Sequence, residues 1–261
     1  MALRARRADL AGSGIFPMSG WFVTDFAAEN IPIPLVGTVT RTPNGLAFSG
    51  TSEKLNLKYR IDMSGSAPYL DCRAHLQDLS GRDRALMLEF RLPLSSEQAW
   101  TWHDGGYEQR EVEPGRRYEM VSGTLTGGGQ RKASIYPFAT LSGRNKSMCL
   151  GVPLMGEPRL FRLFAYKPFI GDAVLGCEFE VGLSPVTKHL PSRAGYRFVI
   201  YGAEQSWAFR RAAERYYEFF PEQFASIMKR HGNWAVLRPT ALNCLLVVAI
   251  PFSADETVMG S

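Results

Sequence analysis

The chain has 261 residues, of which 45% are hydrophobic, 12% aromatic and 21% charged, and its formal net charge is +5. This composition excludes an intrinsically disordered chain and provides enough apolar side chain for a core that needs neither disulfides nor a metal. The basic residues are scattered rather than gathered in one run, and no RNA-recognition or zinc-finger pattern accompanies them, so we expect no nucleic-acid partner.

The N-terminal segment carries Arg4, Arg6 and Arg7 but lacks the apolar block of about 7–15 residues that a signal peptide needs. We therefore expect no export signal in this sequence, and the compartment stays open, because an incomplete N-terminus would still allow export. The longest apolar run, residues 245–250, is far shorter than the roughly 20 residues that span a bilayer. The sequence thus predicts no transmembrane helix and no membrane partner.

Period-two alternation of apolar and polar residues runs from about residue 35 to residue 201 and predicts β-strands. The clearest segments, 54–61 and 70–77, flank a Ser64-Gly65 turn, so we expect them to form a hairpin. Segment 196–201 is apolar on both faces and is placed in the interior. Half-polar strands without βαβ alternation favour stacked antiparallel sheets, so the predicted fold class is mostly β, a large antiparallel sandwich.

The period changes after residue 205. Apolar residues then recur with helical spacing, and this pattern predicts an amphipathic helix whose buried face consists of Phe209, Ala212, Ala213, Tyr216 and Phe220. Pro221 favours the first turn of a second short helix, which we expect to continue to Met228.

The cysteines lie far apart in the sequence and form no C-x-x-C pair, which argues against a zinc knuckle or a redox motif. We expect buried free thiols, no metal and no cofactor. The four residues are Cys72, Cys149, Cys177 and Cys244.

The segment from Trp100 to Tyr107 holds two tryptophans, a histidine and a carboxylate just before a Gly-Gly turn. Sugars bind to such mixtures, because aromatic faces stack on the C–H side of a pyranose ring and polar groups bond its hydroxyls. An alternative stays open, in which this is a tryptophan-rich strand end packed in the core. The candidate carbohydrate-binding residues are Trp100, Trp102, His103, Asp104 and Arg131.

Candidates for catalysis are weaker, and no catalytic set is assigned. His103 has the side chain type that titrates nearest neutral pH, and Glu178 alternates with apolar residues so that it shares a strand face with Glu180, their Cα atoms roughly 6–7 Å apart. The alternative is a solvent-facing pair of glutamates on a sheet exterior. Residues 78–83 lack the ligands of a calcium loop, so we expect a tight turn there. The glycine-rich segment 123–134 lacks the pattern of a phosphate loop, so we expect a surface loop.

A set of short motifs resembles the galactose-mutarotase-like β-supersandwich domain that precedes a glycosidase-type barrel in large bacterial proteins. The resemblance covers roughly residues 35–232, and its motifs are Asp83-Arg84-Ala85-Leu86 through Leu92-Pro93-Leu94, Trp100-Thr101-Trp102, Ser134-Ile135-Tyr136-Pro137-Phe138, Gly182-Leu183-Ser184-Pro185, Trp207-Ala208-Phe209-Arg210 and Arg215-Tyr216-Tyr217-Glu218-Phe219-Phe220-Pro221-Glu222-Gln223-Phe224.

We expect a supersandwich domain at 1–204 and closing amphipathic helices at 205–232. For the tail at 233–261 two alternatives stay open: its apolar strand adds to the sandwich, or the tail is the truncated start of a following domain. The resemblance implies carbohydrate as the partner and a C-terminal barrel that this chain does not contain. The expected function is a non-catalytic carbohydrate-binding or substrate-positioning domain of a larger glycoside-active protein. Two alternatives remain open: a stand-alone epimerase, lyase or hydrolase acting on sugars, and a structural domain whose helix braces a neighbour.

Overall fold

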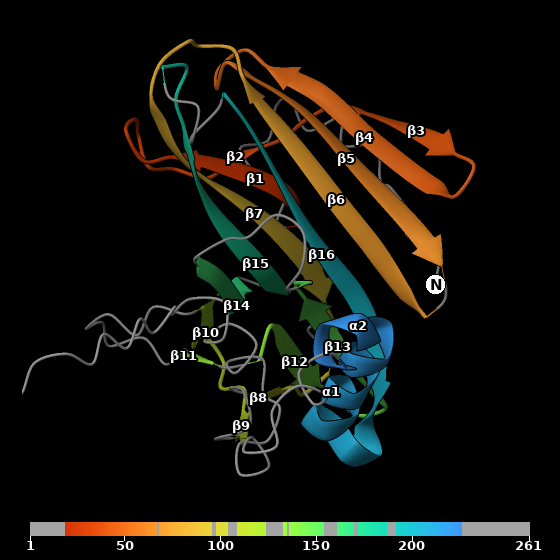
Figure 1. The fold of residues 1–261 in the computed structure, drawn as a ribbon. Helices are drawn as coiled ribbons and strands as arrows, with labels where there is room; N and C mark the ends of the chain where they lie inside the picture. Colours follow the sequence, from red (N-terminus) through yellow and green to blue (C-terminus); the bar gives the residue numbers. More distant parts are fainter. Residues whose placement is uncertain are drawn as a thin grey trace, which may run out of the picture.

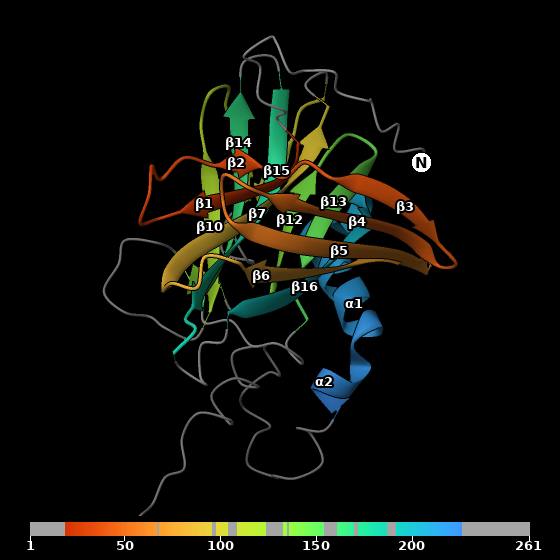
Figure 2. The ribbon, with the colours of Figure 1, turned by 90° about the horizontal axis from the view of Figure 1, so that it is seen from above.

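Two β-sheets stacked on one another make up most of the chain, as the computed structural model shows (Figure 1). The structure describes residues 19–66, 68–95, 98–103, 109–123, 133–134, 136–153, 161–169, 172–186 and 192–225. Seen from above, strands such as β5 and β6 of one sheet run across β14 and β15 of the other (Figure 2). The mostly β sandwich predicted from the sequence is therefore confirmed.

Within the described residues the smaller sheet has seven strands, in the order β11 (Ala133–Ser134), β10 (Tyr118–Gly123), β14 (Phe161–Phe169), β15 (Asp172–Leu183), β7 (Arg84–Leu94), β1 (Gly20–Asp25) and β2 (Ile33–Pro34). The larger has nine, in the order β3 (Thr38–Thr42), β4 (Gly45–Ser52), β5 (Leu57–Ser66), β6 (Tyr69–Asp78), β16 (Arg193–Glu204), β13 (Lys146–Gly151), β12 (Phe138–Ser142), β8 (Thr101–His103) and β9 (Gln109–Glu111). The described strand pairs are antiparallel except β10 with β11, which is parallel.

The alternation in β5 and β6 shows why these segments pair. Tyr59 and Ile61 are buried on one face of β5, and Ile61 lies opposite Ala74 of β6. A slip of one residue would turn every buried side chain of the pair to solvent, so the apolar pattern fixes the register. The predicted hairpin is confirmed, but its turn follows Ser66, because Ser64 and Gly65 lie within β5 opposite Asp71 and Leu70 of β6.

Aromatic rings fill the core between the sheets. Phe179 of β15 stacks on Tyr196 of β16 with 4.2 Å between ring centroids, and Trp21 of β1 lies 5.5 Å from Phe198 of β16. Burying a side chain of this size contributes roughly 1.5–3 kcal/mol, so these contacts across the two sheets dominate the stability of the sandwich.

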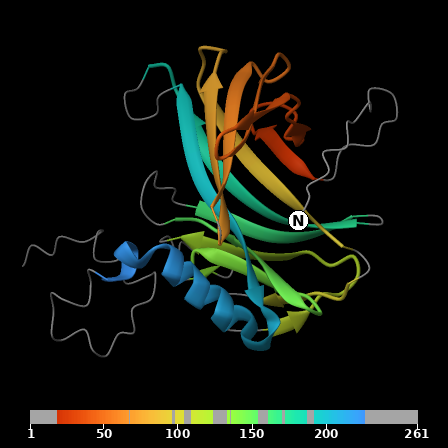
Figure 3. The same ribbon diagram turned by 90° about the vertical axis from the view of Figure 1, so that its right-hand side faces the viewer.

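Helix α1 (Ala208–Phe219) follows the 3-10 turn η1 (Gln205–Trp207), packs on the outer face of the larger sheet and is followed by α2 (Pro221–Ala225) (Figure 3). The hydroxyl of Tyr216 donates a hydrogen bond of 2.7 Å to the carbonyl of Val152, and Ala212 and Tyr216 are fully buried. The predicted amphipathic helix is confirmed, and so is the start of the second helix at Pro221. Its predicted end at Met228 and the tail at 233–261 lie outside the described residues.

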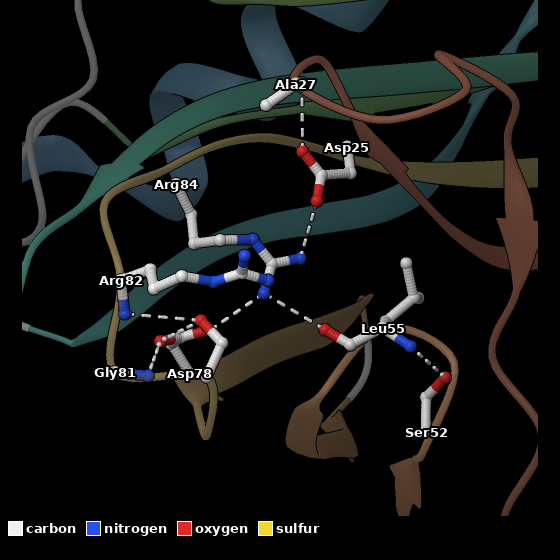
Figure 4. Close-up of polar contacts among 9 residues, drawn as sticks. Asp25, Ala27, Ser52, Leu55, Asp78, Gly81, Arg82 and Arg84 are labelled. Carbon is white, nitrogen blue, oxygen red and sulfur yellow. Dashed lines mark hydrogen bonds and ion pairs between the residues drawn. The ribbon is translucent and has the colours of Figure 1, made fainter.

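The turn after β6 is held by a buried ion-pair network (Figure 4). The Asp78 carboxylate accepts hydrogen bonds from the hydroxyl of Ser80, the N–H of Gly81 and the guanidinium of Arg84, and Arg84 also pairs with Asp25 at 2.8 Å. These contacts tie β6, β7 and β1 together. Residues 78–83 thus form a turn as predicted, and no cluster of three or more potential metal ligands occurs among the described residues.

The cysteines of the described chain, Cys72, Cys149 and Cys177, are free and buried, as predicted. Cys244 lies outside the described residues. Among the helices that the structure describes, none has the length and hydrophobicity needed to cross a membrane.

Candidate carbohydrate-binding site

A cavity of about 690 Å³ opens beside the first turn of helix α1. Three parts of the chain that are distant in sequence line it. They are Ser95, Gln98, Ala99 and Thr101 with Gln109 of β9; the turn 142–145 between β12 and β13; and Gln205 with Ala208 at the start of the helix. The segment selected from the sequence, which begins at Trp100, therefore borders a cavity through Thr101. The other two walls of this cavity were not predicted.

The lining is rich in planar polar side chains. Gln98, Gln109, Asn145 and Gln205 each contribute an amide, and Arg144 contributes a guanidinium. An amide side chain can donate and accept hydrogen bonds at once, which matches the hydroxyl groups of a sugar. No aspartate or glutamate occurs among the described lining residues.

Gly143 allows the first two walls to approach each other. Its N–H donates a 3.0 Å hydrogen bond to the carbonyl of Lys146, which closes the turn. A Cβ at this position would lie 1.3 Å from Nε2 of Gln98 and 3.0 Å from a ring carbon of Trp100, so a larger residue would require the Gln98 side chain to move away from the turn. The Gln98 amide thus packs directly against the backbone of the turn.

A buried polar chain supports the cavity wall from behind. His103 Nε2 lies 2.9 Å from the hydroxyl of Ser142, and this hydroxyl lies 2.9 Å from that of Ser147. The His103 ring is stacked on Phe209 of α1, with 6.2 Å between centroids, and the residue is 4% exposed. Ser142 lines the cavity, and His103 holds the Ser142 hydroxyl in place from behind. His103 itself is not among the lining residues, so its predicted contact with a sugar stays a prediction.

Trp100 and Trp102 both point into the core, because residues two apart on a strand share one face. Trp102 is 2% exposed and packs against Tyr118 of β10, and the indole N–H of Trp100 donates to the carbonyl of Ser95 at 3.0 Å. Both rings are buried, so the predicted stacking of Trp100 and Trp102 on a sugar stays a prediction. The other predicted binding residues, Asp104 and Arg131, lie outside the described residues.

An exposed tryptophan lies in the third wall segment. Trp207 is 62% exposed. It lies in the chain between Gln205 and Ala208, both of which line the cavity. The sequence contained the signal for this residue, because Trp207 falls outside the buried helical face that begins at Phe209. The sequence analysis used Trp207 only as part of a family motif and did not select it as a binding residue.

Glu178 lies elsewhere, on the outward face of the smaller sheet, and is 7% exposed. The prediction of a solvent-facing pair is therefore wrong for Glu178, whereas Glu180 is exposed. Glu178 stands directly opposite Glu89 of β7, and the ammonium of Lys167 lies 2.5 Å from both carboxylates. Arg91 adds a 2.7 Å ion pair to Glu89.

The electrostatics of this charge cluster, formed by Glu89, Arg91, Lys167 and Glu178, favour a structural role. Burial alone would raise the pKa of Glu89, but hydrogen bonds and charges from Arg91 and Lys167 outweigh it and lower that pKa. A general acid in glycoside hydrolysis needs a raised pKa instead. Sequence reasoning missed Glu89, Arg91 and Lys167, because their pairing depends on which strands become neighbours.

No protein-family model matches the chain, and no curated protein matches it in sequence. By structure, the chain is similar to a variant of the GH36 alpha-galactosidase AgaA from Geobacillus stearothermophilus in complex with stachyose, with a TM-score of 0.50, 13% identity, and 80% of this chain and 33% of that chain covered. A galactose mutarotase-like protein from Lactobacillus casei matches with a TM-score of 0.38, 8% identity, and 69% and 80% covered. The fold is the galactose-mutarotase-like β-supersandwich.

The supersandwich resemblance predicted from the sequence is thus confirmed at the level of the fold. This supersandwich corresponds to about a third of the length of AgaA. The match to AgaB from the same organism has the same coverage, with a TM-score of 0.47 and 12% identity. At such identities the likeness concerns the fold alone, so function has to be argued from the residues of this chain.

Proposed function

We propose that this supersandwich is a non-catalytic carbohydrate-binding domain that positions substrate in a larger glycoside-active protein. The observation that carries the proposal is the cavity of about 690 Å³, which is lined by amide side chains. The exposed Trp207 is the sequence neighbour of the lining residue Ala208. Hydroxyl groups of a sugar would bond the amides while its C–H face stacks on the indole ring.

The fold supports the same proposal. AgaA is named as an alpha-galactosidase and was solved with stachyose, and the part of it that this chain resembles is about a third of its length. A domain of this kind would act beside a second domain that carries the hydrolytic residues, and we propose a barrel as that partner. On this view residues 1–204 form the supersandwich, 205–232 form its closing helices and 233–261 lead into the partner.

The roles of the individual residues follow from their positions. Trp207 does not itself line the cavity, but it is exposed and lies in the chain between Gln205 and Ala208, which do, so we assign it the stacking role. Gln205 and Asn145 bond hydroxyl groups from two sides of the cavity. Trp100 and Trp102 act from the core, where they hold the strand end that carries Thr101 at the cavity wall. They are positioning residues, and replacing them would change sugar binding through the shape of the wall.

Isothermal titration of the full chain against stachyose, raffinose and neutral galacto-oligosaccharides tests the proposal. We expect Trp207→Ala and Gln205→Ala each to weaken binding about tenfold, which corresponds to about 1.4 kcal/mol. Matched controls are Phe26→Ala, which removes another exposed aromatic ring, and Gln77→Ala, which removes an exposed amide on β6. Absence of binding both to this neutral panel and to the acidic and esterified saccharides described below, or an equal effect of the controls, would refute the proposal.

A further inference from the structure

Arg144 gives the cavity a positive character that a neutral sugar does not require. It is the one charged side chain among the described lining residues and is exposed. The amides around it are neutral, so among the described lining residues its guanidinium contributes the positive potential.

The guanidinium of Arg144 forms no ion pair or hydrogen bond with any residue that the structure describes. Many other arginines among the described residues do form ion pairs. Arg60 bonds Asp62 at 2.7 Å, and Arg211 of α1 bonds Glu214 at 2.6 Å. Arg144 is therefore available to a ligand without loss of an existing contact.

Glu204, the acidic residue next to the third wall, lies near two other arginines rather than pairing with Arg144. Glu204 precedes Gln205, and its carboxylate lies 3.8 Å from Arg211 and 3.8 Å from Arg215, both on α1. Two guanidinium groups thus offset its charge. Glu204 does not cancel the field of Arg144.

We infer that the saccharide bound here carries a carboxylate, as a uronic acid residue does, and that Arg144 binds this group. The inference rests on the proposed function and specifies its ligand class. A guanidinium presents two parallel N–H donors that match the two oxygens of a carboxylate, and this geometry is both stronger and more selective than a bond to a hydroxyl. The amide of the neighbouring Asn145 lines the same wall and can bond an adjacent hydroxyl.

The test compares trigalacturonic acid with its methyl ester, which has the same sugar rings but no negative charge, and with a neutral galactotriose. Isothermal titration uses the full chain at low and at high salt. We expect the acid to bind at least tenfold more tightly than the ester, and we expect added salt to reduce this preference because the binding site is solvent-accessible.

Variants separate the role of Arg144 from a general effect of charge. Arg144→Gln should remove the preference for the acid, so that acid and ester bind with similar affinity. Arg144→Lys should retain only part of the preference, because a lysine lacks the paired donors. The matched control is Arg41→Gln, an exposed arginine of β3 outside the cavity lining.

Equal affinity for acid and ester, or a preference that persists in Arg144→Gln, would overturn the inference about the carboxylate while the proposed sugar binding stands. Failure of all three saccharides to bind, together with failure of the neutral panel above, would overturn both.

Discussion

Replacing Lys167 by methionine probes the charge cluster on the outward face of the smaller sheet. The Lys167 ammonium bridges Glu89 and Glu178, whose side chains are 1% and 8% exposed. Methionine keeps an unbranched apolar side chain of similar length, so the change removes the charge with little loss of packing. Two carboxylates then face each other across β7 and β15 with Arg91 as the cation left beside Glu89.

The expected loss of unfolding free energy is about 3 kcal/mol. Removing one partner of a buried ion pair costs about 3–5 kcal/mol, because an uncompensated charge stays in a place that water reaches poorly. The lower end applies here, since the Lys167 side chain is 14% exposed and Arg91 still pairs with Glu89 at 2.7 Å. For a domain whose total stability is of the order of 5–15 kcal/mol, this loss is large.

Urea unfolding of the full chain, followed by tryptophan fluorescence, measures this loss as a shift of the midpoint at constant slope. Lys54→Met is the matched control, because Lys54 forms a 3.4 Å pair with Glu29 in which the two side chains are 64% and 66% exposed. An exposed pair contributes at most about 1 kcal/mol. The double variant Lys167→Met with Glu178→Gln should recover part of the loss. It removes the carboxylate whose remaining cation, Arg117, is 3.8 Å away, whereas Glu89 keeps its 2.7 Å pair with Arg91.

The pH dependence gives an independent check. The folded pKa of Glu89 lies below its usual value of 4.5, so the stability that its ionised form contributes is present above about pH 4.5 and is lost as pH falls through the folded pKa. Lys167→Met removes one of the cations that lower this pKa. The difference between wild type and variant should therefore be largest near neutral pH and shrink below about pH 4. A loss no larger than that of Lys54→Met, or one that does not change with pH, would refute this account of the cluster.

Three further substitutions or modifications have definite expected outcomes. Trp102→Ala should lower the unfolding free energy by about 3–5 kcal/mol in the same urea assay, because a large buried ring is removed; a loss below about 1 kcal/mol would contradict its place in the core. Gly45→Ala should cost about 1–3 kcal/mol and raise amide exchange in β4 and β5, because the new Cβ would lie 2.0 Å from the carbonyl oxygen of Met63; unchanged exchange would contradict this close approach. Burial raises the pKa of Cys149 to about 12, so this thiol should resist a thiol reagent at pH 8 until urea unfolds the chain, as mass spectrometry of its peptide would show; rapid labelling of the native protein would contradict it.

Local patterns predicted those elements whose two faces differ. The alternation in β5 and β6 and the helical spacing after Phe209 each mark one buried face, and both elements formed as expected. Strand β1 was missed because Trp21, Phe22 and Val23 are all buried, which leaves no alternation to detect. Strands covered on both sides resemble any short apolar run in the sequence.

The candidate site shows where local patterns stop being sufficient. The segment around Trp100 does reach a cavity, but strand geometry turns the tryptophans inward and gives the cavity side to Thr101. The period-two rule, applied to this segment as it was applied to β5, would have predicted that orientation. The other two walls could not be inferred in this way, because 142–145 and 205–208 meet residues 98–101 only through the order of strands in the larger sheet. A binding site assembled across a sheet is thus a property of topology, and the residues that form it have to be tested as a set.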